Sequence, residues 1–133
     1  MATKVVGGGA APARRVSRAE LRPNVREIYE ARDRVNRVAR HTPLQHSQWL
    51  SERAGCDVWL KLECWQRTNS FKMRGAYNAI ASLDDATRDK GLVTASAGNH
   101  GQAVALAARL FGAHATIYVP ENAPDTKKAR IRG

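Results

Sequence analysis

The chain has 133 residues, of which 43% are hydrophobic and 26% charged, a composition typical of a soluble globular domain. The sequence contains no apolar run near the ~20 residues that a membrane-spanning helix needs. Its ten glycines and five prolines are too few for a collagen-like or low-complexity chain. The length alone fits one ordinary domain.

The positive charge, +10 overall, is concentrated near the N-terminus. Ten of the 22 basic residues but only four of the 12 acidic ones lie in residues 1–41. Nucleic-acid-binding surfaces combine basic with aromatic side chains, and residues 1–28 contain no Phe, Tyr or Trp. We therefore expect no nucleic-acid partner and no membrane partner. Residues 1–23 are predicted to be a disordered basic tail, because their Gly, Ala and Pro content buries little apolar surface.

The cysteines and histidines predict no special chemistry. Cys56 and Cys64 lie in a chain without a recognisable secretory signal, which favours a reducing compartment and a cytoplasmic location. The four histidines do not combine with the cysteines at the spacing of a zinc site. The sequence therefore predicts no metal site.

The first half of the chain predicts two helices and a strand. Apolar residues recur at helical spacing over residues 25–39. A shorter helix fits residues 47–54, with Ser47 as its N-cap and Gly55 as its C-terminal stop. Residues 57–63 alternate between apolar and polar side chains, which indicates a strand.

The second half alternates helices with strands. Ser70 is placed to cap a helix over residues 71–83. The following residues predict a strand, a helix, a strand and the start of a further helix, at 91–95, 100–111, 114–119 and 124–133. Such alternation is typical of parallel sheets with right-handed crossovers, so we expect an α/β fold.

One candidate functional residue, Lys72, lies in the opening turn of the helix predicted over residues 71–83. The helix dipole presents partial positive charge there, which disfavours an ammonium group. Such a site favours the neutral amine, the form that attacks a carbonyl or takes up a proton. A solvated lysine that merely begins a helix remains the alternative.

A second candidate site is the loop Ser-Ala-Gly-Asn-His-Gly at residues 96–101, between a predicted strand and a predicted helix. Backbone N–H groups and the helix dipole converge at such a turn and suit a carboxylate or phosphate. The loop matches neither the dinucleotide-binding nor the Walker pattern, which argues against those ligands. A purely structural turn remains possible.

Together these segments resemble a known family. The matching strings are HTPLQHS, VWLKLECWQRTNSFKMRGAYNAI, TASAGNHGQAVALAARLFG and ATIYVPENAP, which span residues 41–124 with gaps. They are similar to the N-terminal part of fold-type II pyridoxal-phosphate enzymes of the threonine/serine dehydratase and serine racemase group. The resemblance implies an α/β fold like that of the tryptophan synthase β chain, with parallel sheets and flanking helices, here truncated. It also implies pyridoxal 5'-phosphate as cofactor.

The resemblance assigns roles to individual residues. Lys72 would carry the cofactor covalently and then act as the catalytic base that removes the substrate α-proton. Phe71 would pack beside the cofactor ring, and Asn99 would hydrogen-bond its 3' oxygen. The substrate carboxylate would be bound by Ser96, Gly98, Asn99 and His100.

The implied reaction is β-elimination from L-threonine or L-serine, which yields a 2-oxo acid and ammonia. Serine racemases of this type carry a serine acid/base immediately before Gly-Asn-His, where this chain has Ala97. A methyl group has no transferable proton, so we expect dehydratase chemistry on a small amino acid and not racemisation. Serine racemase or another fold-type II activity is the alternative within the group.

Family members have two domains and are expected to be homo-oligomers. We predict that residues 24–88 begin the larger, cofactor-binding domain and that residues 89–133 begin the smaller one. The glycine-rich loop that holds the cofactor phosphate in the family comes later than Gly133, so we expect a fragment that is inactive alone. Two further hypotheses are a non-catalytic chain that pairs with another chain and a basic binding module driven by the tail.

Overall fold

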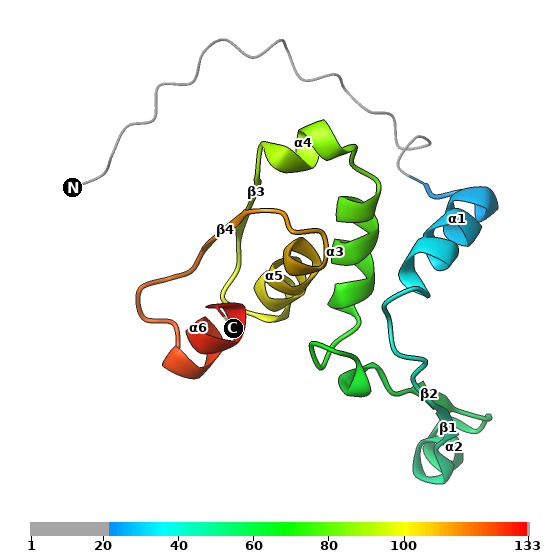
Figure 1. The fold of residues 1–133 in the computed structure, drawn as a ribbon. Coiled ribbons are helices and arrows are strands. Elements are labelled where there is room, and N and C mark those ends of the chain that lie inside the picture. Colours follow the sequence, from blue (N-terminus) through cyan, green and yellow to red (C-terminus); the bar gives the residue numbers. More distant parts are fainter. Residues whose placement is uncertain (1–21, 133) are drawn as a thin grey trace.

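The computed structural model describes residues 22–132, so nearly all of the tail predicted over residues 1–23 lies outside the described residues. Helices and short strands alternate along the chain (Figure 1). In order they are α1 (Val25–Val35), β1 (Leu44–His46), α2 (Gln48–Ala54), β2 (Trp59–Lys61), a 3-10 turn η1 (Glu63–Trp65), α3 (Lys72–Ala81), α4 (Asp85–Asp89), β3 (Leu92–Ala95), α5 (Asn99–Leu110), β4 (Ala115–Tyr118) and α6 (Asp125–Arg132).

Side-chain caps determine where the first two helices begin. Asn24 and Glu27 form a reciprocal capping box at the start of α1, each side chain accepting the other's backbone N–H. Ser47 caps α2 as expected, and Gly55 ends that helix in the left-handed conformation that favours glycine.

The strand predicted over residues 57–63 is shorter and has an unexpected partner. It is β2, and it pairs antiparallel with β1, with Leu44 opposite Lys61 and His46 opposite Trp59. The all-parallel arrangement expected from alternating strands and helices therefore does not extend to this pair. A three-residue strand is too short to show a clear sequence alternation, which explains why β1 was not predicted.

The predicted strand, helix and strand over residues 91–119 form a βαβ unit. β3 and β4 pair in parallel, with Leu92 beside Ala115 and Ala95 beside Tyr118. α5 connects them, which confirms the parallel crossover expected for this part of the chain. α6 follows β4 and lies near α5 (Figure 1).

α3 begins differently from the prediction. Its N-cap is Phe71, which makes no side-chain capping bond, and the buried hydroxyl of Ser70 has no hydrogen-bond partner. The prediction that Ser70 caps this helix is therefore wrong. α3 ends at Ala81, and α4, which was not predicted, begins after the N-cap Asp84.

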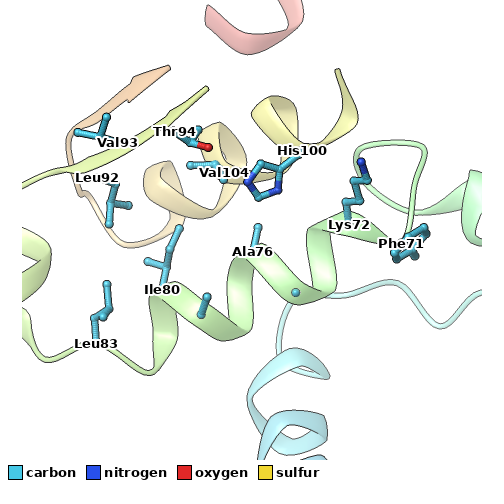
Figure 2. Close-up of a pocket in the computed structure, with 12 residues that line it drawn as sticks. Phe71, Lys72, Ala76, Ile80, Leu83, Leu92, Val93, Thr94, His100 and Val104 are labelled. Atoms are coloured by element: carbon cyan, nitrogen blue, oxygen red, sulfur yellow. The ribbon is translucent and has the colours of Figure 1, made fainter. Parts of the chain in front are cut away.

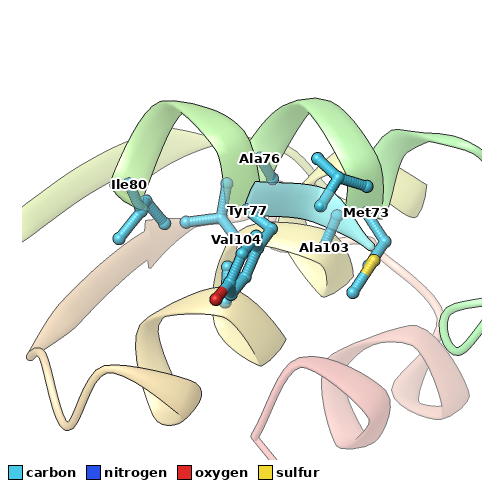
Figure 3. Packing of buried hydrophobic residues seen from close by; sticks show 8 residues of the cluster. Met73, Ala76, Tyr77, Ile80, Ala103 and Val104 are labelled. Carbon is cyan, nitrogen blue, oxygen red and sulfur yellow. The ribbon is translucent and has the colours of Figure 1, made fainter. Parts of the chain in front are cut away.

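The core lies where α3 crosses α5. Met73 and Ala103 are fully buried in it, and small alanine side chains along α5 let the two helices approach closely (Figure 3). Tyr77 stacks on Phe111, with ring centroids 5.1 Å apart. This one apolar cluster joins residues on both sides of position 88, and the domain division predicted there stays a prediction.

Candidate active site

A cavity of about 510 Å³ lies between α3, β3 and the first turns of α5. Its lining is apolar apart from Lys72, Thr94 and His100, and no carboxylate is among the described residues that line it. Figure 2 shows the aliphatic side chains of Ile80, Leu83 and neighbouring residues toward one end, away from Lys72. The cavity thus combines an apolar wall with a small number of polar groups, as small-molecule sites commonly do.

Lys72 is the first residue of α3, and its side chain is exposed at the cavity. The preceding residue, Phe71, already has the backbone conformation of a right-handed helix. Figure 2 shows the Lys72 side chain extending from this first turn on the same side as the His100 ring. An accessible amine therefore stands beside an apolar wall and an imidazole.

The loop after β3 leads directly into the N-terminus of α5. Gly98 is the N-cap and has no side chain with which to cap the helix. The first N–H groups of an α-helix have no intrahelical partner, so those of Asn99 and His100 are available to an anion. The Gly98 N–H instead donates to Ser96 Oγ at 3.2 Å, a bond that holds the turn itself.

Gly101 makes the tight turn possible. A Cβ at this position would lie 2.4 Å from the Ser96 carbonyl oxygen and 3.3 Å from the Ile117 side chain. No real Cβ tolerates the first of these distances, so only glycine lets the loop fold back this closely over α5. The glycine is therefore required by the shape of the loop.

The structure brings three of the predicted site residues to one cavity. Phe71, Lys72 and His100 all line it, although the Phe71 side chain is 63% exposed. The other three lie in the adjoining loop and first turn of α5 and do not line the cavity: Ser96, Gly98 and Asn99. Their assigned contacts with cofactor and substrate stay predictions.

Sequence reasoning missed most of the cavity wall. One face of α3 continues from Lys72 along the cavity, and its members recur at alternating intervals of three residues and one residue. That spacing is the helical period, so the face could have been found by extending the stripe that begins at Lys72. Its further members are Gly75, Ala76, Ala79 and Ile80, and Leu83 follows just beyond the end of the helix.

A network of polar side chains lies beneath the start of α3. Glu63 accepts two hydrogen bonds from the Arg74 guanidinium, both at 2.8 Å, and one from the Thr42 hydroxyl at 2.6 Å. The bond from Arg74, with smaller contributions from Thr42 and Lys61, lowers the pKa of Glu63 from 4.5 to about 2. Glu63 in turn raises the pKa of Arg74.

Residues 22–132 include no group of three or more His, Cys, Asp or Glu side chains placed to hold a metal ion. None of the helices in the same part of the chain is long and apolar enough to cross a bilayer.

The fold and the site together define a class of protein. A βαβ crossover places a helix N-terminus beside an apolar cavity, and a lysine amine stands at that cavity. This combination is typical of α/β proteins that bind small molecules. The chain belongs to the pyridoxal-phosphate-dependent enzyme family, whose model matches residues 35–133.

Curated relatives fit this family. The chain is 49% identical over 106 residues to the L-threonine ammonia-lyase of Thermotoga maritima, a match that covers 80% of this chain and 26% of that protein. It is 40% identical over 111 residues to the L-threo-3-hydroxyaspartate ammonia-lyase of Saccharomyces cerevisiae, which covers 84% of this chain and 34% of that protein. The chain therefore spans about a quarter to a third of these relatives.

Solved structures agree with this relationship. Maize serine racemase superposes with a TM-score of 0.77 at 41% identity, covering 82% of this chain and 33% of that one. Threonine deaminase isoform 2 of Solanum lycopersicum superposes with a TM-score of 0.71 at 38% identity, covering 83% and 32%. The fold-type II architecture expected from the sequence is thereby confirmed.

The residues present fit pyridoxal phosphate. Its aldehyde requires an amine, which Lys72 supplies at the cavity. Its flat ring suits the apolar wall, and a carboxylate bound beside it suits the N-terminus of α5. The amine, the wall and the helix N-terminus lie next to one another, so these residues fit the cofactor.

Proposed function

We propose that this chain carries the lysine-bearing part of an ammonia-lyase that acts on L-threonine or L-serine. Loss of the β-hydroxyl as water, followed by hydrolysis of the enamine that forms, yields a 2-oxo acid and ammonia. The placement of Lys72 at an apolar cavity beside the N-terminus of α5 is the observation that carries the proposal. The 49% identity to an L-threonine ammonia-lyase supports the choice of reaction.

Each site residue then has a defined task. When bound, pyridoxal phosphate supplies an electron sink that stabilises the negative charge left at the substrate α-carbon. Lys72 Nζ binds the cofactor and later takes the α-proton, a role that requires an uncharged amine. Phe71 would pack against the ring, and Asn99 would donate to the ring's 3' oxygen.

The substrate carboxylate is oriented by the loop that leads into α5. The N–H groups of Asn99 and His100 bind it with the help of the helix dipole, and Ser96 and Gly98 complete the turn around it. A carboxylate held there fixes the α-carbon near Lys72 and excludes water from one side.

Position 97 separates elimination from racemisation. Racemisation needs a second proton donor on the opposite face of the substrate, and the methyl group of Ala97 has no proton to give. Serine is therefore expected to be converted mainly to the 2-oxo acid. A chiral assay that finds serine racemisation as fast as elimination would overturn this preference.

The setting of the enzyme is part of the proposal. Cys56 and Cys64 are both free and exposed, which supports a reducing, cytoplasmic location. We also propose that the active form is a homo-oligomer, with a small amino acid as substrate and neither nucleic acid nor membrane as partner.

Lys72 can be tested directly. Incubation of the chain with pyridoxal phosphate should give the yellow absorbance of a cofactor joined to a lysine, and Lys72→Ala should remove it. Lys90, an exposed lysine at the end of α4, gives the matched control, because Lys90→Ala should leave the absorbance unchanged. Equal absorbance in wild type and Lys72→Ala would contradict the role of Lys72.

A further inference from the structure

The first turn of α3 is poorly stabilised by its own sequence. Its N-cap Phe71 makes no side-chain capping bond, and the buried Ser70 hydroxyl has no partner. Lys72 then adds a cation where the helix dipole disfavours one. Contacts from outside the helix must therefore hold this turn in place.

The Glu63–Arg74 ion pair supplies such a contact. The guanidinium of Arg74 binds both carboxylate oxygens of Glu63 at 2.8 Å. The side chain of Arg74 is only 30% exposed and that of Glu63 only 16%. Two-point pairing of this kind fixes direction as well as distance. It therefore restrains both the position and the rotation of the first turn of α3.

Further bonds tie this pair to the segment before β1. The Thr42 hydroxyl donates to Glu63 Oε1 at 2.6 Å, and Arg74 Nη2 also donates to the Arg40 carbonyl oxygen at 3.3 Å. The side chain of Gln66 is fully buried. It accepts a hydrogen bond from the Arg40 backbone N–H and donates one to the Arg40 carbonyl oxygen. The carboxylate of Glu63 thus stands within a network anchored on two separate chain segments.

Arg74 does not approach the cavity itself. It follows Lys72 by two residues, which corresponds to a rotation of about 200° around the helix axis. Lys72 lines the cavity and Arg74 does not. The ion pair therefore acts on Lys72 from the opposite side of α3, without touching a ligand.

We propose that Arg74, Glu63 and Thr42 are positioning residues for Lys72, which hold the uncapped start of α3 so that the Lys72 amine projects into the cavity. This inference rests on the proposed role of Lys72 in binding pyridoxal phosphate. It assigns a task to three residues that lie outside the cavity. The pair stays ionised throughout the neutral range, because the pKa of Glu63 is about 2.

The test measures how selectively Lys72 reacts. Each folded variant is treated with pyridoxal phosphate, reduced with borohydride and digested, and mass spectrometry gives the ratio of labelled Lys72 to labelled Lys90. A lower ratio in a variant whose far-UV circular dichroism matches that of wild type reports poorer placement of Lys72, because general loosening of the fold would change the spectrum. In wild type the ratio should be well above one.

Three substitutions should lower the ratio in a set order. Glu63→Gln removes the charge and should lower it by about tenfold, because small displacements of a reacting group are costly. Arg74→Lys keeps the charge but loses the two-point pairing, and should lower the ratio by less. Thr42→Val removes one hydrogen bond and should give the smallest decrease in the ratio. Arg26→Met breaks the exposed Arg26–Glu30 pair, with side chains 88% and 48% exposed, and should change nothing.

The outcomes separate the two proposals. A wild-type ratio near one would overturn the proposed role of Lys72 and this inference with it. A high wild-type ratio that persists in folded Glu63→Gln and Arg74→Lys would overturn the positioning role alone. If Glu63→Gln does not fold, Arg74→Lys and Thr42→Val still test the positioning role, because the proposal requires the ratio to fall in both variants.

Discussion

At the scale of single residues, the site depends on side chains that never reach a ligand. Glu63 is the clearest example, because its carboxylate accepts hydrogen bonds from Arg74 and Thr42 and is attracted by the nearby positive charge of Lys61. Gly101 contributes through the absence of a side chain, since any Cβ there would collide with the Ser96 carbonyl oxygen. We propose that residues of this kind place the amine of Lys72.

The lowered pKa of Glu63 predicts how stability depends on pH. A carboxyl group with a pKa of about 2 when folded and 4.5 when unfolded contributes stability that is complete above about pH 4.5. That contribution is lost as the pH falls from about 5 toward 2. After allowance for solvent screening we expect about 1–2 kcal/mol.

Urea unfolding followed by circular dichroism at about pH 6 and about pH 3 measures this effect. The free energy of unfolding should fall less between the two values in Glu63→Gln than in wild type. Glu30→Gln, at an exposed pair, should keep the wild-type difference. Identical pH dependence in wild type and Glu63→Gln would show that the Glu63 carboxylate is not specially stabilised.

Sequence motifs pointed to residues that share one cavity. Lys72 and His100 were singled out from the sequence, and the structure brings both to one cavity. Glu63 and Thr42 carried no such signal, because their importance comes from contacts with residues 11 and 21 or more positions away. Long-range polar pairs of this kind cannot be found from local patterns.

At the scale of elements, the starts of α2 and α3 are fixed in different ways, the first by a local side-chain cap and the second by contacts with distant residues. α2 begins at a side-chain cap, in which Ser47 Oγ accepts the Leu50 N–H at 3.4 Å. α3 begins without one and is held by packing of Met73 and by the Arg74 ion pair. A serine before an apolar run was therefore a correct signal in one case and a misleading one in the other.

The two serines give a matched prediction. Ser47→Ala should destabilise the chain by about 0.5–1 kcal/mol, because the capping bond is lost. Ser70→Ala should be neutral or slightly stabilising, because a buried hydroxyl without a partner is costly and alanine removes it. Urea unfolding monitored by circular dichroism measures both, and amide exchange in α2 and α3 shows which helix responds. A larger loss for Ser70→Ala than for Ser47→Ala would contradict this account.

The strands were less predictable than the helices. The β3–α5–β4 unit was predicted because its strands are apolar and its loop contains glycine. β2 was predicted as part of the strand over residues 57–63, but its partner β1 was not, because β1 has only three residues, all exposed, too few to show an alternating pattern. α4 escaped because its only clear signal is the cap, in which Asp84 accepts the Thr87 N–H.

At the scale of the whole molecule, the chain leaves many large apolar side chains uncovered. All three tryptophans are exposed, Trp49 by 61%, Trp59 by 56% and Trp65 by 60%, whereas buried side chains gather around α3 and α5. The curated relatives are three to four times as long as the segment they share with this chain. We infer that in a complete enzyme further polypeptide covers the region around α2, β1 and β2.

This inference predicts that the chain assembles with the segment of a relative that lies outside the matched region. Mixing this chain with the remaining C-terminal segment of the Thermotoga maritima L-threonine ammonia-lyase should shift tryptophan emission to the blue, because exposed indoles become buried. Threonine-dependent release of ammonia should appear with the shift. Lys72→Ala should still assemble, with the same shift, but should release no ammonia. A blue shift without activity in wild type would favour a non-catalytic chain that pairs with another, and absence of any shift would contradict the inferred cover.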